Sequence, residues 1–174
     1  MMEHFAELII DDRNSKELLA SNGIVWRVVS DTVMGGVSSG KLIPTETEGR
    51  HCLRLTGDVS LENNGGFVQA SLDLCGSGLL DASDYSGIEI EIYGNGEVYN
   101  LHLRTEDTRI VWQSYRTSFH ALPHWQTLRL CFDDFQPYRI DKPLDIKKLR
   151  RLGVVAIGRE MHADVCIGRL SLFR

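Results

Sequence analysis

Two neighbouring segments of alternating residues limit most what this chain can fold into. Residues 87–93 place isoleucine at every second position between acidic residues, and residues 98–104 repeat the alternation with one tyrosine and two leucines. Between them, Gly94-Asn95-Gly96 favours a tight turn. Side chains two residues apart lie on the same face of a strand, so we expect an antiparallel hairpin with one face in a hydrophobic core.

Short strand-like segments continue over most of the chain. Alternating or β-branched stretches predict strands at residues 5–10, 24–29, 37–43, 51–56, 67–74, 109–119, 125–132, 153–158 and 165–173. We expect short helices only at residues 14–20 and 145–151, and a polar turn at residues 45–50. This pattern predicts an all-β fold, an antiparallel β-sandwich of the jelly-roll kind, that forms a single domain over residues 1–174.

The bulk composition argues against some classes of function. The 174 residues are 43% hydrophobic and 25% charged, which is typical of a globular domain with a sizeable core. The formal net charge of -5 argues against a nucleic-acid partner, because a sequence-independent nucleic-acid binder needs a basic face. No apolar run is long enough to cross a membrane, and the first residues lack the features of a secretory signal. We therefore expect a cytoplasmic protein that is not membrane-embedded.

The spacing of reactive residues does not indicate catalysis. Cys52, Cys131 and Cys166 lie in apolar or alternating stretches, and no two of the four cysteines have metal-ligand spacing, so we expect reduced, buried thiols. The chain contains no P-loop, nucleophile elbow, zinc signature or dinucleotide-binding fingerprint. Asp133 and Asp134 are adjacent, which suits acid–base catalysis poorly because neighbours on a strand point to opposite faces. We expect a protein that is not an enzyme, with no metal and no cofactor.

The segment from Ser30 to Ser38 predicts an unusually specific loop between two strands. Asp31 can hydrogen-bond its own backbone in a turn, and Gly35-Gly36 permits positive φ or a close backbone approach. Two interpretations stay open: the loop contacts a partner, or its acid and glycines only shape the turn. Further along the chain, Asn64-Gly65-Gly66 is a strong turn signal with the same two interpretations.

A second set of candidate residues comes from the expected strand faces. One predicted strand presents Asn100, His102 and Arg104 on the face opposite the core, and the next strand presents Gln113 and Tyr115 on one face. In one sheet these side chains would form a polar, aromatic platform. Such a platform suits a sugar or an extended polypeptide, because aromatic rings stack and arginine donates several hydrogen bonds. Ordinary exposure of polar residues to solvent is the simpler alternative.

Several short motifs occur in an order that is specific as a set. Trp26 with the run from Ser30 to Ser38 forms the first motif, and Asn64-Gly65-Gly66-Phe67 forms the second. The later motifs are Tyr85-Ser86-Gly87-Ile88, Gly94-Asn95-Gly96, Leu103-Arg104-Thr105, Trp125, residues 132–137 and Leu152-Gly153. Together, from about residue 24 to the C-terminus, they resemble the complex I intermediate-associated protein family.

The resemblance implies a galactose-binding-like jelly roll and a chaperone-like role in the assembly of respiratory complex I. It implies a protein partner, such as subunits of a membrane or respiratory complex. We therefore expect a non-catalytic protein-interaction or assembly-factor module, with a carbohydrate-binding module and a sugar ligand as the alternative. The expected contact residues are Asp31, Gly35, Gly36, Ser38 and Asn64 at the loop, and Arg104, Gln113 and Tyr115 on the sheet face.

Overall fold

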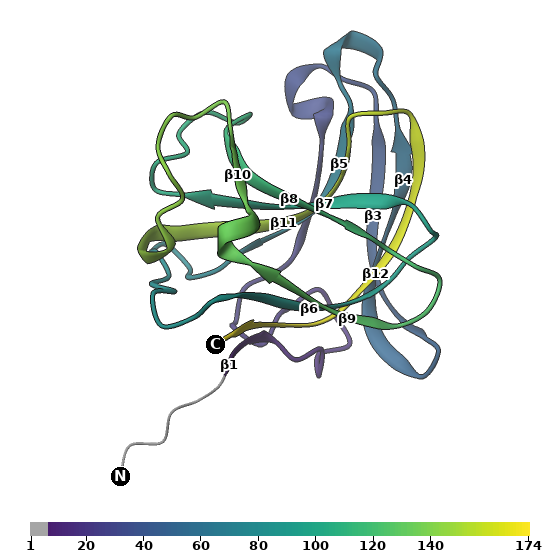
Figure 1. Cartoon of the computed structure of the whole chain (residues 1–174). Coiled ribbons are helices and arrows are strands. Elements are labelled where there is room, and N and C mark those ends of the chain that lie inside the picture. The colour runs from purple at the N-terminus through teal and green to yellow at the C-terminus, as the bar shows by residue number, and fades with distance from the viewer. Residues whose placement is uncertain (1–6) are drawn as a thin grey trace.

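Two antiparallel β-sheets packed against each other form the protein in a computed structural model (Figure 1). The structure describes residues 7–174, apart from the side chain of Asn64. The predicted all-β antiparallel sandwich of the jelly-roll kind is therefore confirmed.

The first sheet has the strand order β3-β4-β12-β6-β9, with β1 also paired to β12. Its strands are β1 (Glu7–Asp11), β3 (Ser39–Thr47), β4 (Arg50–Val59), β6 (Gly87–Tyr93), β9 (Gln126–Cys131) and β12 (Met161–Phe173). Because Glu7 pairs with Phe173, the strand β1 lies beside the C-terminal end of the chain (Figure 1).

The second sheet has the strand order β10-β8-β7-β11-β5-β2. Its strands are β2 (Arg27–Ser30), β5 (Phe67–Asp73), β7 (Val98–Thr105), β8 (Ser114–His120), β10 (Gln136–Tyr138) and β11 (Leu149–Ile157). Four short 3-10 turns complete the fold: η1 (Asp31–Met34), η2 (Glu62–Asn64), η3 (Phe132–Asp134) and η4 (Ile146–Lys148).

The hairpin predicted from residues 87–93 and 98–104 is wrong, because β6 pairs with β12 and β9 whereas β7 pairs with β8 and β11 in the other sheet. The Gly94-Asn95-Gly96 segment crosses between the sheets, where the N–H groups of Gly94 and Gly96 donate to the carbonyl oxygens of Leu122 and Ala121.

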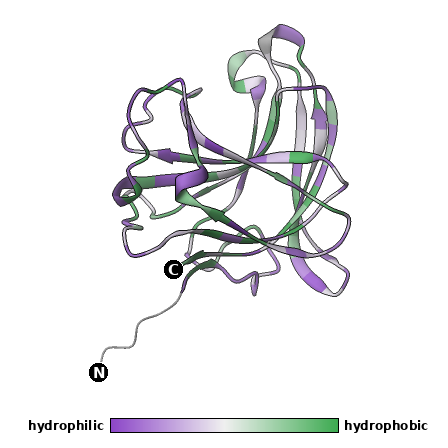
Figure 2. Cartoon of the chain, viewed as in Figure 1, coloured by the Kyte–Doolittle hydropathy of each residue, from purple (hydrophilic) through white to green (hydrophobic). Residues whose placement is uncertain are grey.

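The core lies between the two sheets, as the alternation predicts. Ile88, Ile90 and Ile92 of β6 have no exposed surface, and neither do Leu101 and Leu103 of β7. Hydrophobic and hydrophilic residues alternate along the strands (Figure 2). Each strand of the second sheet therefore buries one face and leaves the other face outside the sandwich.

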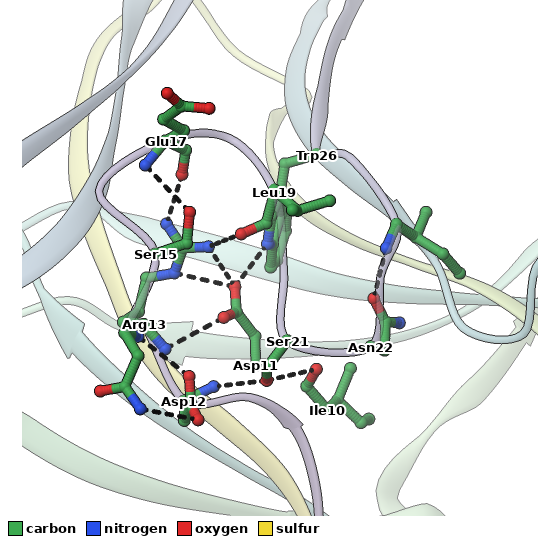
Figure 3. A network of polar contacts seen from close by, with 12 residues as sticks. Ile10, Asp11, Asp12, Arg13, Ser15, Glu17, Leu19, Ser21, Asn22 and Trp26 are labelled. Carbon is green, nitrogen blue, oxygen red and sulfur yellow. Dashed lines mark hydrogen bonds and ion pairs between the residues drawn. The ribbon is translucent and has the colours of Figure 1, made fainter.

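A buried ion pair holds the segment that joins β1 to β2 (Figure 3). The Asp11 carboxylate accepts hydrogen bonds from Arg13 Nε at 2.8 Å and from Trp26 Nε1 at 2.7 Å. Asp11, Arg13 and Trp26 are all almost fully buried. A buried charge is tolerated only when it is paired and hydrogen-bonded, so these three side chains depend on one another.

The helix predicted at residues 14–20 is wrong. The guanidinium of Arg13 donates to the carbonyl oxygens of Glu17 and Leu19, at 3.0 and 2.9 Å. Leu19 also forms an isolated antiparallel bridge with Val25. The chain therefore curls around a buried arginine, and two carbonyl oxygens in this segment accept from a side chain. The local sequence pattern that predicted the helix carries no information about the buried charge of Arg13.

One strand boundary and one helix differ from the prediction. β3 runs through Pro44 to Thr47, where a turn was expected. Proline is tolerated there because β3 is an edge strand and need not donate a ladder hydrogen bond. The short helix expected at residues 145–151 is a single 3-10 turn, η4, in which the Asp145 side chain accepts from the Lys147 N–H at 3.0 Å.

Segment 109–119 was predicted as one strand, but β8 begins only at Ser114. Residues 109–113 form a loop instead, and Gln113 Oε1 accepts from the backbone N–H groups of Arg109 and Ile110, at 3.0 and 3.2 Å. Because these two N–H groups donate to the Gln113 side chain, they are not available for hydrogen bonds to a neighbouring strand.

The four cysteines are free thiols. Cys52 and Cys166 are buried as predicted, but Cys131 is exposed. Cys131 ends the edge strand β9, in which every second residue faces solvent. Within residues 7–174, no helix has the length and apolar character needed to cross a membrane; the cytoplasmic location stays a prediction.

Replacing Asp11 with asparagine should destabilise the protein by about 3–5 kcal/mol, because it leaves the buried Arg13 guanidinium without its counter-charge. Urea unfolding followed by far-UV circular dichroism measures this change. Asp141→Asn, at an exposed position, is the control and should change the free energy of unfolding by less than about 0.5 kcal/mol. Equal stability of the two variants would contradict a structural role for the ion pair.

Candidate functional site

The loop after β2 is built around the carboxylate of Asp31. The side chain of Asp31 has no exposed surface. It accepts hydrogen bonds from the Ser38 N–H at 2.9 Å, from Ser38 Oγ, and from the backbone N–H groups of Gly66 and Phe67. One carboxylate thus joins the loop after β2 to the turn before β5, which lies about thirty-five residues further along the chain.

Gly36 and Gly65 leave room for that carboxylate because they have no Cβ. A Cβ on Gly36 would lie 2.4 Å from Asp31 Cγ, and a Cβ on Gly65 would lie 2.5 Å from Asp31 Oδ2. Gly35 has a different role, because it ends η1 with a φ of 86° and has no neighbour near its missing Cβ. The loop residues Asp31, Gly36 and Ser38 therefore form a scaffold. Whether any of them also contacts a ligand stays a prediction, as it does for Asn64, whose side chain lies outside the described part of the structure.

Hydrogen bonding keeps Asp31 ionised. Burial alone would raise the pKa of this carboxyl, but the hydrogen bonds from Ser38, Gly66 and Phe67 outweigh burial and lower the pKa below its usual value. The buried charge is thus compensated by donors from two loops.

The same loop turns its apolar side chains outward. Val33 is 62% exposed, Val37 is 48% exposed and Met34 is 42% exposed. The η1 coil at the top of the view is accordingly coloured as hydrophobic (Figure 2). Exposed apolar side chains grouped on one loop are typical of contact surfaces.

A groove of about 610 Å³ lies on the outer face of the second sheet. Its lining runs from Val29 on the edge strand β2 to Tyr138 on the opposite edge strand β10. The floor includes Asn100 and His102 of β7 and Gly153 of β11. Met34 of the η1 loop also lines it, so the scaffold around Asp31 shapes one end of the groove.

The predicted platform is correct for β7 and wrong for part of β8. Asn100, His102 and Arg104 line the groove, and so does Gln113 from the loop before β8. Tyr115 was expected on the same face, but it has no exposed surface. Its hydroxyl donates to the carbonyl oxygens of Lys142 and Pro143, at 2.8 and 3.2 Å.

The error at Tyr115 has a simple structural cause. With β8 paired to β7, Leu103 lies opposite Tyr115 and His102 lies opposite Arg116. Tyr115 therefore joins Leu103 in the core, and Arg116 faces outward beside His102. The polar and aromatic groove residues that the sequence analysis missed include Gln69, Ser71, Trp112, Ser114, Arg116, Tyr138, Arg139 and Arg151.

His102 is the buried titratable group of the groove floor. It is 9% exposed, and its Nε2 atom has no hydrogen-bond partner among the described residues. Burial, helped by the positive charge of Arg116, lowers the pKa of His102 to about 3. The imidazole is therefore neutral at pH 7 and retains one nitrogen that a ligand could satisfy.

Arg104 combines two roles. Its guanidinium donates to the carbonyl oxygens of Val111 and Thr108, at 2.9 and 3.1 Å, and so holds the loop between β7 and β8. The same side chain lines the groove. Arg104 is thus part of the wall, and its loss would also release the loop that carries Trp112.

Comparison with known proteins identifies the family. The family model described as "Complex I intermediate-associated protein 30 (CIA30)" matches residues 14–165. The chain belongs to this family. The match covers the segments that build the Asp31 scaffold as well as most of the groove. No curated protein matches the chain.

Several solved structures similar to this CIA30-family chain are carbohydrate-binding modules. The family 11 module of cellulase Lic26A-Cel5E from Clostridium thermocellum has a TM-score of 0.76 at 13% identity, with 98% of this chain and 96% of that chain covered. The family 30 module of cellulase Cel9D-Cel44B from the same organism has a TM-score of 0.65 at 17% identity, with 96% and 95% covered. At such identities the similarity shows a shared fold.

Replacing Asp31 with alanine should lower the free energy of unfolding by roughly 2–4 kcal/mol, because buried donors from Ser38, Gly66 and Phe67 lose their acceptor. Thermal and urea unfolding measure the loss. Thr32→Ala, at an exposed position of the same turn, is the matched control and should cost less than about 1 kcal/mol. An unchanged stability of the Asp31 variant would show that the carboxylate is not a scaffold.

Stability should depend on pH through His102. Its pKa is about 3 when folded and about 6.5 when unfolded, so the unfolded state binds the extra proton as the pH falls below 6.5. Between pH 6 and pH 4 the wild type should lose about 1.4 kcal/mol per pH unit more than His102→Gln. Urea midpoints across this range test the difference, and parallel curves would mean that folded His102 protonates freely.

Proposed function

We propose that this chain is a non-catalytic binding module that holds an extended segment of a partner protein in its groove. The observation that carries the proposal is the groove itself, which runs from one edge strand of the second sheet to the other. Six strands at about 4.8 Å spacing give it a length of about 24 Å, which matches about seven residues of extended polypeptide at roughly 3.3 Å each.

The lining suits a polypeptide. Asn100, Gln69 and Arg104 supply amide and guanidinium groups that can pair with peptide groups or polar side chains. Met34 at one end, and Val111 and Trp112 at the other, supply half-exposed apolar surface. Protein interfaces combine such aromatic and methionine anchors with polar donors.

The family supports a protein partner. The matching model is named for association with complex I intermediates, and an assembly factor acts by holding a partner rather than by chemistry. We therefore assign the partner to the class of protein subunits that are assembled into a larger complex, including subunits of a respiratory complex.

A carbohydrate-binding function is the second candidate. A family 11 module that has a TM-score of 0.75 to this chain is described in complex with a β-1,3-1,4-mixed-linked tetrasaccharide, and Trp112 at the groove is 49% exposed. Tyr138, which lines the groove together with Trp112 and Phe67, is less suitable for stacking on a sugar. Its ring carries the guanidinium of Arg116 at 3.6 Å from the centroid, which covers one ring face.

Filling the groove should abolish partner binding. Asn100 lies on the central strand β7 and is only partly exposed, so Asn100→Trp places a large ring in the groove. We expect peptides selected from a displayed random library on the wild type to lose at least about tenfold in affinity for Asn100→Trp. Thr127→Trp, at an exposed position of β9 in the other sheet, is the control and should retain them.

The same two variants separate the two candidate functions. Binding of mixed-linked β-glucan oligosaccharides that is lost in Asn100→Trp, without any selected peptide, would replace the peptide function with the sugar function. Peptides that bind both variants equally well would place the site outside the groove. Circular dichroism and melting temperature check that each variant is folded.

A further inference from the structure

The groove carries positive charge in an acidic protein. Four of its lining residues are arginines, namely Arg104, Arg116, Arg139 and Arg151, and none of its lining residues is an aspartate or a glutamate. The chain as a whole has a formal net charge of -5. The positive charge is therefore concentrated locally, where it creates a field that attracts anions.

Three of these arginines have no counter-charge within residues 7–174. Arg151 pairs with Asp73 at 2.7 Å, but no ion pair of the described residues includes Arg104, Arg116 or Arg139. Arg104 donates to two backbone carbonyl oxygens instead. Arg109, Arg150 and Arg174, which do not line the groove, have no carboxylate partner among the described residues either. The groove differs from the rest of the surface because its guanidinium groups are clustered on a lining that contains no acidic residue.

Arg116 is the arginine best placed to bind a ligand. Its Nε donates to Ser114 Oγ at 2.8 Å, and its guanidinium lies over the ring of Tyr138. These two contacts fix the plane of the guanidinium. They use one of its nitrogens, and the two Nη groups have no hydrogen-bond partner among the described residues. A fixed guanidinium with two free nitrogens is the arrangement that binds a carboxylate in a bidentate manner.

Like charges also face each other across the groove floor. Arg104 on β7 lies opposite Arg151 on β11, and like charges in directly paired positions are destabilising. Burial, followed by the charges of Arg151 and Arg150, lowers the pKa of Arg104. Burial, and to a smaller extent Arg139, lowers the pKa of Arg116. A bound anion would remove this repulsion.

His102 adds a second, independent sign of a missing ligand atom. Its Nε2 is buried without a partner and lies in the floor beside Arg116, to which His102 is paired in register. An unpartnered buried nitrogen in a native structure is uncommon and marks a place for a ligand or water. A carboxylate oxygen held by Arg116 would accept a hydrogen bond from the neutral imidazole when Nε2 carries the proton and the ring turns toward the groove.

We infer that the partner segment is acidic, with an aspartate or glutamate carboxylate bound by Arg116 and His102 and flanked by uncharged residues. The inference rests on the function proposed above and specifies its ligand. Carboxylate recognition follows from the unpaired guanidinium groups, and the uncharged flanks follow from the apolar side chains at both ends of the groove. The surrounding positive charge also makes the binding sensitive to salt.

Two pools of capped heptapeptides test the inference. One pool carries glutamate at the central position and the other carries glutamine, with alanine, valine and threonine mixed at the remaining six positions. Amide chemical shifts of β7, β8 and β11 report binding to the groove during titration. The glutamate pool should bind at least about tenfold more tightly than the glutamine pool, and this difference should shrink when sodium chloride is raised.

Matched variants assign the effect to the groove. Arg116→Gln should remove the preference for glutamate, whereas Arg109→Gln, which makes the same charge change at an exposed residue outside the groove lining, should keep it. If Arg116→Gln does not fold, Arg139→Gln replaces it, because Arg139 is an exposed residue of the same groove. That variant should weaken the preference.

The possible failures are distinguishable. Equal binding of the two pools at the groove amides would overturn the acidic partner and leave the peptide-binding function in place. A glutamate preference that persists in Arg116→Gln and Arg139→Gln would overturn the assignment of the carboxylate to this site. If neither pool shifts the groove amides, the peptide-binding function fails and the inference fails with it.

Discussion

The buried carboxylate of Asp31 is the interaction on which one whole end of the molecule depends. It accepts hydrogen bonds from Ser38, Gly66 and Phe67, and it requires the absence of a Cβ at Gly36 and Gly65. Through these contacts it joins the loop after β2 to the turn before β5, and β2 and β5 are neighbouring strands. The run from Ser30 to Ser38 and the turn at Asn64–Phe67 thus meet at one carboxylate, which accounts structurally for Ser38, Gly36 and Gly65.

A different constraint shapes the groove. The alternation that buries Tyr99, Leu101 and Leu103 must turn the intervening residues of β7 outward. On the outer face, the strands β8 and β11 add arginines next to them, where partial burial makes unpaired charge costly. Stability alone favours neither the like-charged pair of Arg104 and Arg151 nor the unpartnered His102 nitrogen, so their presence on one face supports the proposed ligand.

Strands with long, regular alternation could be predicted from the sequence, because side chains two residues apart lie on the same face and this alone decides which residues are buried. This holds for β6, β7 and the core they build. The segment at residues 14–20 could not, because the buried Arg13, which is paired with Asp11, takes the carbonyl oxygens of Glu17 and Leu19. The groove was predicted in part. A loop held by Gln113 shortens the next strand, and the pairing of β8 with β7 places Tyr115 beside Leu103 in the core and Arg116 beside His102 on the groove face.

The fold by itself does not choose the ligand. Carbohydrate-binding modules with 13–17% identity share this sandwich over nearly their whole length, so the same two sheets can present different outer faces. What distinguishes a face is the chemistry of the side chains that alternate outward. Here the ring of Tyr138 is covered by Arg116 rather than left free for stacking, and three guanidinium groups lack carboxylate partners within the described chain. Trp112 stays half-exposed at the groove, but the face offers mainly charge and hydrogen-bond donors, and this chemistry supports the proposed acidic partner.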